Sequence, residues 1–129
     1  MEERFIKGVE LFNARSFFEA HDTWEELWRE TRGDHRLFYQ GLIQTAVGLY
    51  HLLNANCRGA CSQFEKALSK LGHYIPAHHG INTSELVREV RECLNDAELL
   101  CRGEISRFDQ TKIPRILLDE VLLSSKAKE

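Results

Sequence analysis

The sequence is poor in helix-breaking residues and lacks long apolar runs. Only Pro76 and Pro114 among its 129 residues are proline, and no stretch alternates apolar and polar residues as a half-buried strand does. No uncharged apolar run approaches the roughly 20 residues of a membrane-spanning helix. The first residues, MEERFIKGVE, lack the apolar core of a secretion signal. We therefore expect a helical, cytoplasmic protein without a membrane-spanning segment.

The sequence also lacks any strong bias of charge. Its formal net charge is -3, and lysine and arginine are interleaved with aspartate and glutamate, so nothing favours a nucleic-acid partner. Hydrophobic residues make up 43% of the chain, which is enough to bury a core. The length suits one domain. We expect a single helical domain over residues 1–123 and a frayed C-terminal tail over residues 124–129.

Cysteine is present but in no metal-binding pattern. The four cysteines are Cys57, Cys61, Cys93 and Cys101, and no C-x-x-C pair occurs among them. Cys57 and Cys61 are four residues apart and would share one helix face. Because no secretion signal is evident, we expect four reduced thiols rather than a disulfide framework.

Apolar residues recur at helical spacing in five segments. They predict helices over residues 2–13, 17–31, 35–55, 58–71 and 83–101. Ser16 with Glu19 predicts a capping box at the second helix, and Asn82 with Glu85 predicts a cap at the fifth. The segment from Ile113 to Leu118 is apolar enough to dock on the helices.

A weak internal repeat supports this arrangement. A shift of forty residues aligns five pairs: Gly8 with Gly48, Phe12 with Leu52, Ala20 with Ala60, Trp24 with Phe64 and Leu27 with Ala67. Small residues where helices cross and large ones between them suit two antiparallel helix pairs. We predict an all-α fold: a compact bundle of about five helices, with two stacked tetratricopeptide-like hairpins, a closing helix and a C-terminal tail.

Polar residues form a line on each of two apolar helices. The second helix carries His21, Trp24, Glu25 and Trp28 on one face, with Asp22 beside them. The third carries Arg36, Gln40, Gln44, His51 and Asn54 along one side. Burying such groups unpaired costs roughly 1–3 kcal/mol each. We therefore predict a partly buried polar cluster between the two helices.

Three interpretations of this cluster remain open. The first is a structural network in which Glu25 orients His21. The second is a divalent-metal site of a hydrolytic enzyme, held by His21, His51 and either Glu25 or Asp22. The third is a pocket for a small molecule or protein segment. In the third case the walls are Trp24, Trp28 and Tyr50. The preferred function is a non-enzymatic binding domain. Whether the protein is an enzyme, and whether it forms a homodimer through its tail or last helix, is left open.

A second group of histidines lies between the fourth and fifth helices. His73, His78 and His79 fall in a loop that also contains Pro76. We expect them to be exposed to solvent, without a functional role.

The residues of the polar cluster also carry a resemblance to a known family. Residues 17–28, FFEAHDTWEELW, resemble the signature FxEAHExxExxW, and the matching pattern continues through Arg36, residues 38–44, Tyr50-His51 and Asn56-x-x-Gly59-Ala60. This is similar to the family catalogued as domain of unknown function 309, over about residues 8–71. The resemblance implies a small all-helical fold and no established activity. Its motif positions are His21, Glu25, Trp28, Arg36, Gln40, Gln44, His51 and Asn56; Asp22 stands where the pattern usually has glutamate.

Overall fold

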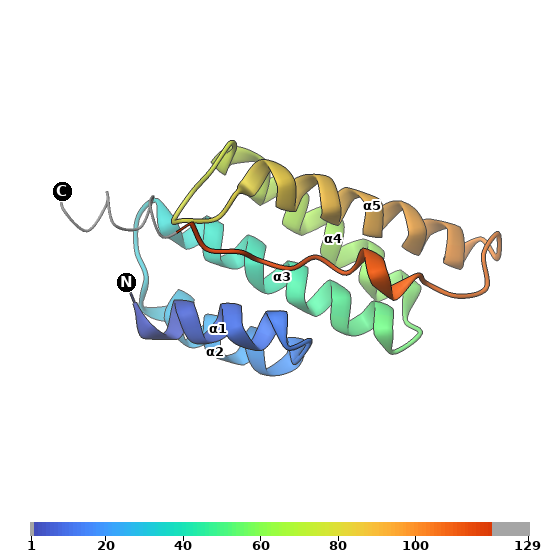
Figure 1. The fold of residues 1–129 in the computed structure, drawn as a ribbon, viewed down its shortest axis with the longest axis horizontal. Coiled ribbons are helices and arrows are strands. Elements are labelled where there is room, and N and C mark those ends of the chain that lie inside the picture. Colours follow the sequence, from blue (N-terminus) through green and yellow to red (C-terminus); the bar gives the residue numbers. More distant parts are fainter. Residues whose placement is uncertain (1, 120–129) are drawn as a thin grey trace.

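The fold consists of two helical hairpins and a closing helix (Figure 1). A computed structural model describes residues 2–119. The helices are α1 (Glu3–Asn13), α2 (Phe17–Glu30), α3 (His35–Leu53), α4 (Cys57–Leu71) and α5 (Thr83–Cys101), with the short 3-10 turns η1 (Gly72–Tyr74) and η2 (Gln110–Lys112). The predicted all-α fold is confirmed. The predicted domain end at residue 123 and the tail 124–129 lie outside the described residues.

The central helix is α3, which packs against α2 on one side and α4 on the other. Ten of its residues are buried, including Phe38, Leu42 and Leu49. Its apolar surface joins that of all four other helices in one core. None of the helices within residues 2–119 combines the length and the apolar character needed to cross a membrane.

The repeat seen in the sequence is a repeat of structure. A Cβ atom added to Gly8 would lie 2.0 Å from Nε1 of Trp24, and one added to Gly48 would lie 2.5 Å from the Phe64 ring. Each hairpin therefore packs a large aromatic side chain directly onto a glycine of its first helix. The turns repeat as well, because Arg15 and Ala55 both have positive φ angles, 64° and 59°.

The structure confirms one of the two predicted helix caps. Asn82 accepts from the backbone N–H of Glu85 (3.0 Å), as expected. Ser16 makes no side-chain cap bond, so the predicted capping box is wrong. Asn56, its counterpart in the repeat, has similar backbone angles and does accept from Gly59 N (2.9 Å). The longer asparagine side chain reaches a backbone N–H that the serine hydroxyl does not.

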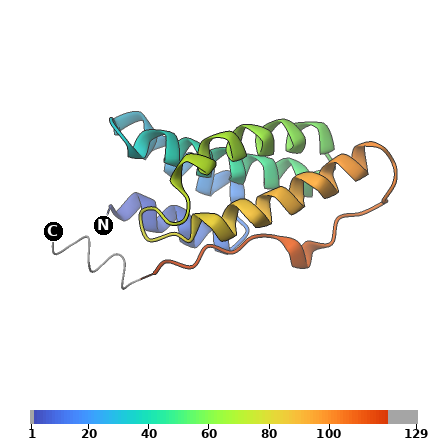
Figure 2. The ribbon, with the colours of Figure 1, turned by 90° about the horizontal axis from the view of Figure 1, so that it is seen from above.

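The chain after α5 returns along the bundle as an extended segment, residues 104–119, between α1 and α5 (Figures 1 and 2). The side-chain amide of Asn13 fixes it, donating to Ile116 O (2.7 Å) and accepting from Ile116 N (2.8 Å). Ile116 is buried, and Leu118 pairs with Ile81 in a single β-bridge. The expected docking of residues 113–118 is confirmed.

A disulfide joins Cys57, the first residue of α4, to Cys101, the last residue of α5. The expectation of four reduced thiols is therefore wrong for this pair. The two helices are antiparallel, which brings residues 44 positions apart together. Cys61 and Cys93 are free thiols, and burial raises the pKa of Cys93 to about 12. The Cys93 thiol therefore stays protonated at neutral pH.

We predict that Gly8→Ala destabilises the protein, because the new methyl group overlaps the Trp24 ring. Overpacking of this kind costs about 1–3 kcal/mol. The matched control is Gly72→Ala, since a Cβ atom there has no neighbour within 4 Å and the backbone is helical. Urea unfolding should show a lower midpoint for Gly8→Ala and an unchanged or higher one for Gly72→Ala. Equal midpoints would contradict the close packing.

We predict that reduction of the Cys57–Cys101 bond lowers the free energy of unfolding by about 2–4 kcal/mol, because the unfolded chain regains entropy. Urea unfolding with and without a phosphine reductant measures the effect. The variant Cys101→Ser should have the stability of the reduced protein and not respond to the reductant. An oxidised protein whose midpoint is insensitive to reduction would refute a stabilising role.

Candidate functional site

The imidazole of His21 lies between two carboxylates on the outer side of α2. Its Nδ1 is 3.2 Å from Asp22 Oδ1, and its Nε2 is 2.8 Å from Glu25 Oε2. The second carboxylate oxygen of Glu25 accepts from Arg29 (3.0 Å). His21 and Glu25 are half-buried, with side-chain exposures of 22% and 31%. The helical spacing of the residues thus produces the expected polar contact along α2.

The C-terminal end of α2 is tied to the start of α3 by Arg36. Its guanidinium carbon lies 4.0 Å from the centre of the Trp28 ring. The same group donates to the backbone oxygens of Trp28 (2.9 Å) and Thr31 (3.2 Å). The indole Nε1 of Trp28 is buried and has no hydrogen-bond partner within residues 2–119.

Aromatic side chains border the other end of the site. The Phe18 ring lies 5.6 Å from the rings of both His21 and Tyr50, so it links α2 with α3. Phe18 and Tyr50 are 50% and 39% exposed, so the two rings form an aromatic pair on the surface. Sequence analysis did not select Phe18, although it precedes His21 by one helical turn.

The polar line of α3 lies on its outer surface. Helical spacing places Gln40, Gln44 and His51 on the side that also carries Arg36. All four are half-buried, and Gln44 Oε1 is buried without a hydrogen-bond partner among the described residues. We define the α2/α3 strip as Phe18, His21, Glu25, Trp28, Arg36, Gln40, Gln44 and Tyr50.

His51 faces α4 instead of α2. Asn56 donates to His51 Nδ1 (3.3 Å), and a Cβ atom on Gly59 would lie 2.9 Å from the His51 ring. The preceding residue, Tyr50, contacts Phe18 of α2. The contacts of His51 are therefore with the start of α4.

The structure consequently does not assemble the expected metal site of His21, Glu25 and His51. Within residues 2–119, the group of three potential ligands whose ligand atoms all lie within 4.8 Å of one another is His21, Asp22 and Glu25. All three residues belong to α2, and Asp22 is the exposed one.

Trp24 does not line the site that the sequence suggested. It is fully buried in the core, and its Nε1 donates to Phe5 O (3.1 Å). Of the three residues expected to wall a binding pocket, only Trp28 and Tyr50 belong to the α2/α3 strip. The two tryptophans differ because Trp24 is the residue that packs against Gly8, which draws it into the first hairpin.

The histidines after α4 are not all exposed. His73 is exposed, but His78 and His79 are half-buried beside the start of α3, so the expectation is wrong for these two. His78 shares a hydrogen bond with His35 (2.9 Å), and His79 shares one with Tyr39 (2.9 Å). Burial raises the pKa of Tyr39 to about 12, so its hydroxyl keeps its proton. The partners His35 and Tyr39 belong to α3, some forty residues earlier in the chain, so local sequence patterns do not reveal these contacts.

Comparison with other proteins gives two uncharacterised relatives. An uncharacterized protein of Aquifex aeolicus (strain VF5) is 26% identical over 100 residues, 76% of this chain. The uncharacterized protein YpuF of Bacillus subtilis (strain 168) is 42% identical over 53 residues, 40% of this chain. The aligned part covers only 30% of the length of each relative.

The family comparison locates the shared part of the chain. Residues 5–62 match the family described as domain of unknown function. They contain α1 from its third residue, all of α2 and α3, and the start of α4. Every residue of the α2/α3 strip lies within this range. The resemblance seen in the sequence is therefore confirmed over residues 5–62, which match the family described as domain of unknown function (DUF309).

Proposed function

We propose that this chain is a binding domain that holds a protein segment along the α2/α3 strip. The observation that carries the proposal is a set of three buried polar atoms on the strip, His21 Nδ1, Trp28 Nε1 and Gln44 Oε1, that have no hydrogen-bond partner among residues 2–119. A buried polar atom without a partner costs about 1–3 kcal/mol, and nearly all such atoms in folded proteins are satisfied.

A bound segment can recover this free energy. The three side chains are only half-buried as a whole, so each of these atoms belongs to a side chain that also reaches the surface. His21 Nδ1 has only Asp22 nearby, at 3.2 Å, and this contact does not align as a hydrogen bond. A segment that offers backbone donors and acceptors would satisfy all three positions.

The strip also has the residue types that dominate protein interfaces. Tryptophan, tyrosine and arginine are enriched among residues that contribute most to binding. The strip presents Trp28 with Arg36 at one end and Tyr50 with Phe18 at the other. From Phe18 to Trp28 the helix rises about 15 Å, at about 1.5 Å per residue, which suits a segment of several residues.

A protein segment suits the strip better than a small molecule does. Small ligands bind in concave cavities. The strip instead carries the exposed rings of Phe18 and Tyr50 on the surface of two neighbouring helices. The proposal needs no catalytic group and is therefore a non-enzymatic function.

A cytoplasmic location belongs to the same proposal. Disulfides are rare in the cytoplasm, where thiols are kept reduced. Cys57 and Cys101 would then be thiols in the cell and would form their bond on exposure to an oxidant. The strip does not contain either cysteine, so its side chains are available in both states.

We predict that a photo-crosslinking residue at position 18 captures a partner protein in cells, and that Tyr50→Ala reduces this capture at least tenfold. The ring of Tyr50 is exposed, so its removal affects the fold little. A crosslinking residue at position 75 is the control, because Ile75 is equally exposed (54%) but lies outside the strip. Mass spectrometry of the crosslinked peptide identifies the bound segment. Capture that is equal at positions 18 and 75, or that Tyr50→Ala leaves unchanged, would refute the proposal.

A second candidate function, a metal-dependent hydrolase, is favoured by the closeness of His21, Asp22 and Glu25. One imidazole and two carboxylates can hold a divalent cation such as Zn²⁺ and leave positions open for water and substrate. This set differs from the one expected from sequence in having Asp22 in place of His51.

For this candidate we predict stoichiometric Zn²⁺ binding that His21→Ala weakens at least tenfold and His51→Ala leaves unchanged. Titration calorimetry with ZnCl₂ measures both variants, and circular dichroism verifies that each is folded. Equal loss in the two variants would point to the set expected from sequence. Absence of zinc binding by the unmodified chain would remove the candidate.

A further inference from the structure

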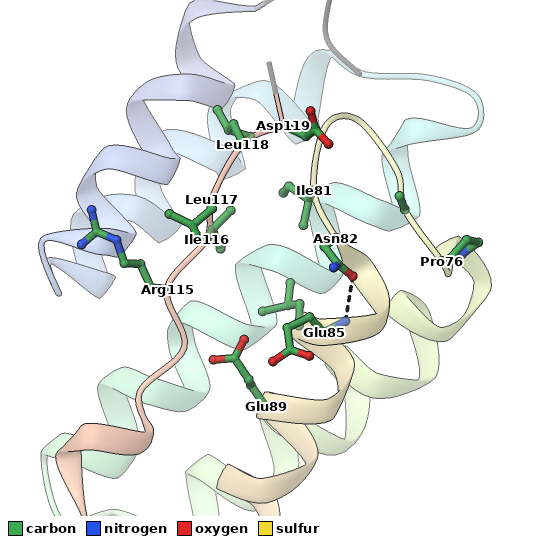
Figure 3. A pocket seen from close by; sticks show the side chains of 12 residues that line it. Pro76, Ile81, Asn82, Glu85, Glu89, Arg115, Ile116, Leu117, Leu118 and Asp119 are labelled. Atoms are coloured by element: carbon green, nitrogen blue, oxygen red, sulfur yellow. Dashed lines mark hydrogen bonds between the residues drawn. The ribbon is translucent and has the colours of Figure 1, made fainter. Parts of the chain in front are cut away.

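An apolar cavity lies away from the α2/α3 strip, between the start of α5 and the C-terminal segment (Figure 3). Its volume is about 750 Å³, within the roughly 300–1,000 Å³ of cavities that bind small molecules. Residues 76–89 form one side of the cavity, and residues 115–119 form the other.

The floor of the cavity is aliphatic. Ile81, Leu86 and Ile116 contribute to it and are at most 3% exposed. Leu118 also lines the cavity and pairs with Ile81 in the β-bridge. An apolar chain placed here would leave water and gain about 25 cal/mol for each Å² of apolar surface that it buries.

Two carboxylates of α5 point into the cavity from the wall that faces residues 115–119 (Figure 3). They belong to Glu85 and Glu89, one helical turn apart. Glu85 accepts from Arg88 Nε (3.1 Å), so its charge is already paired. Glu89 has no hydrogen bond or ion pair with any residue of the described range, although its side chain is half-buried.

The surroundings of Glu89 disfavour its charge. Burial raises the pKa of Glu89, and the neighbouring carboxylates of Glu85 and Glu92 raise it further, against a smaller opposing effect of Arg88. Arg115 is the only cationic residue in the lining, and its guanidinium points away from Glu89 (Figure 3). A ligand with a positive charge would supply the partner that the described residues do not.

We propose that this cavity binds an aliphatic amine, whose alkyl chain lies on the floor of Ile81, Leu86 and Ile116 and whose ammonium group pairs with Glu89. The proposal is independent of the strip, because the two sites share no residue. The same cavity should reject aliphatic carboxylates of equal length, since their charge would lie beside the Glu85 and Glu89 carboxylates.

The test is a titration of the full chain with hexylamine, followed by methyl NMR. We expect saturable shifts of the Leu86, Ile116 and Leu118 methyl signals, and no such shifts with sodium hexanoate. Glu89→Gln should weaken hexylamine binding about tenfold, which is the effect of losing about 1.4 kcal/mol from one charge-assisted contact. Because this variant removes a half-buried, unpaired charge, its melting temperature should not fall.

The matched control is Glu98→Gln, which makes the same change on α5 outside the cavity and should leave the affinity within twofold. The proposal is overturned if hexanoate produces the same shifts, if Glu89→Gln binds as tightly as the unmodified chain, or if the shifting methyl groups lie elsewhere. It is also overturned if hexylamine binds only to a chain shortened to end at Asp119, because the cavity would then belong to the chain's own C-terminal end.

Discussion

The structure depends on the direct packing of an aromatic ring against a glycine in each hairpin. Gly8 contacts Trp24, and Gly48 contacts Phe64, at distances that no other residue type allows. These contacts fix the register of α1 against α2 and of α3 against α4. Once the two registers are fixed, the side of each helix that faces outward is fixed too. The residues of the α2/α3 strip therefore face outward because the opposite sides of α2 and α3 are packed in the core.

The position of α3 explains why polar residues there are half-buried. Two helices pack against α3, so most of its circumference is apolar and buried. The remaining outer surface is narrow, and residues placed on it are flanked by α2 and α4. Gln40 and Gln44 are consequently close to apolar surfaces while remaining reachable from solvent. A polar group in such a place is satisfied by a neighbour or by a binding partner, and Gln44 Oε1 has no such neighbour within residues 2–119.

The sequence predicts those features that depend on local spacing. The five helices follow from apolar residues at a period of 3.6, and the forty-residue repeat aligned the two glycines and the two aromatic residues that the structure then packs together within each hairpin. It did not predict that His51 contacts the start of α4 rather than His21 and Glu25, because that contact depends on how α4 packs against α3. It also did not predict the Cys57–Cys101 bond, which requires knowledge of how α4 and α5 are paired. Both failures concern contacts between elements rather than the elements themselves.

The family match distinguishes the two proposed sites. A function shared by the family must reside in the segment that its members share, and residues 5–62 contain the whole strip. The amine cavity is built by residues 76–119, outside this segment, and depends on α5 and on the Asn13 contact that fixes Ile116. Binding along the strip is therefore the property to seek in relatives that align only over the first helices. The cavity is to be sought only where the closing helix and the returning C-terminal segment are also present.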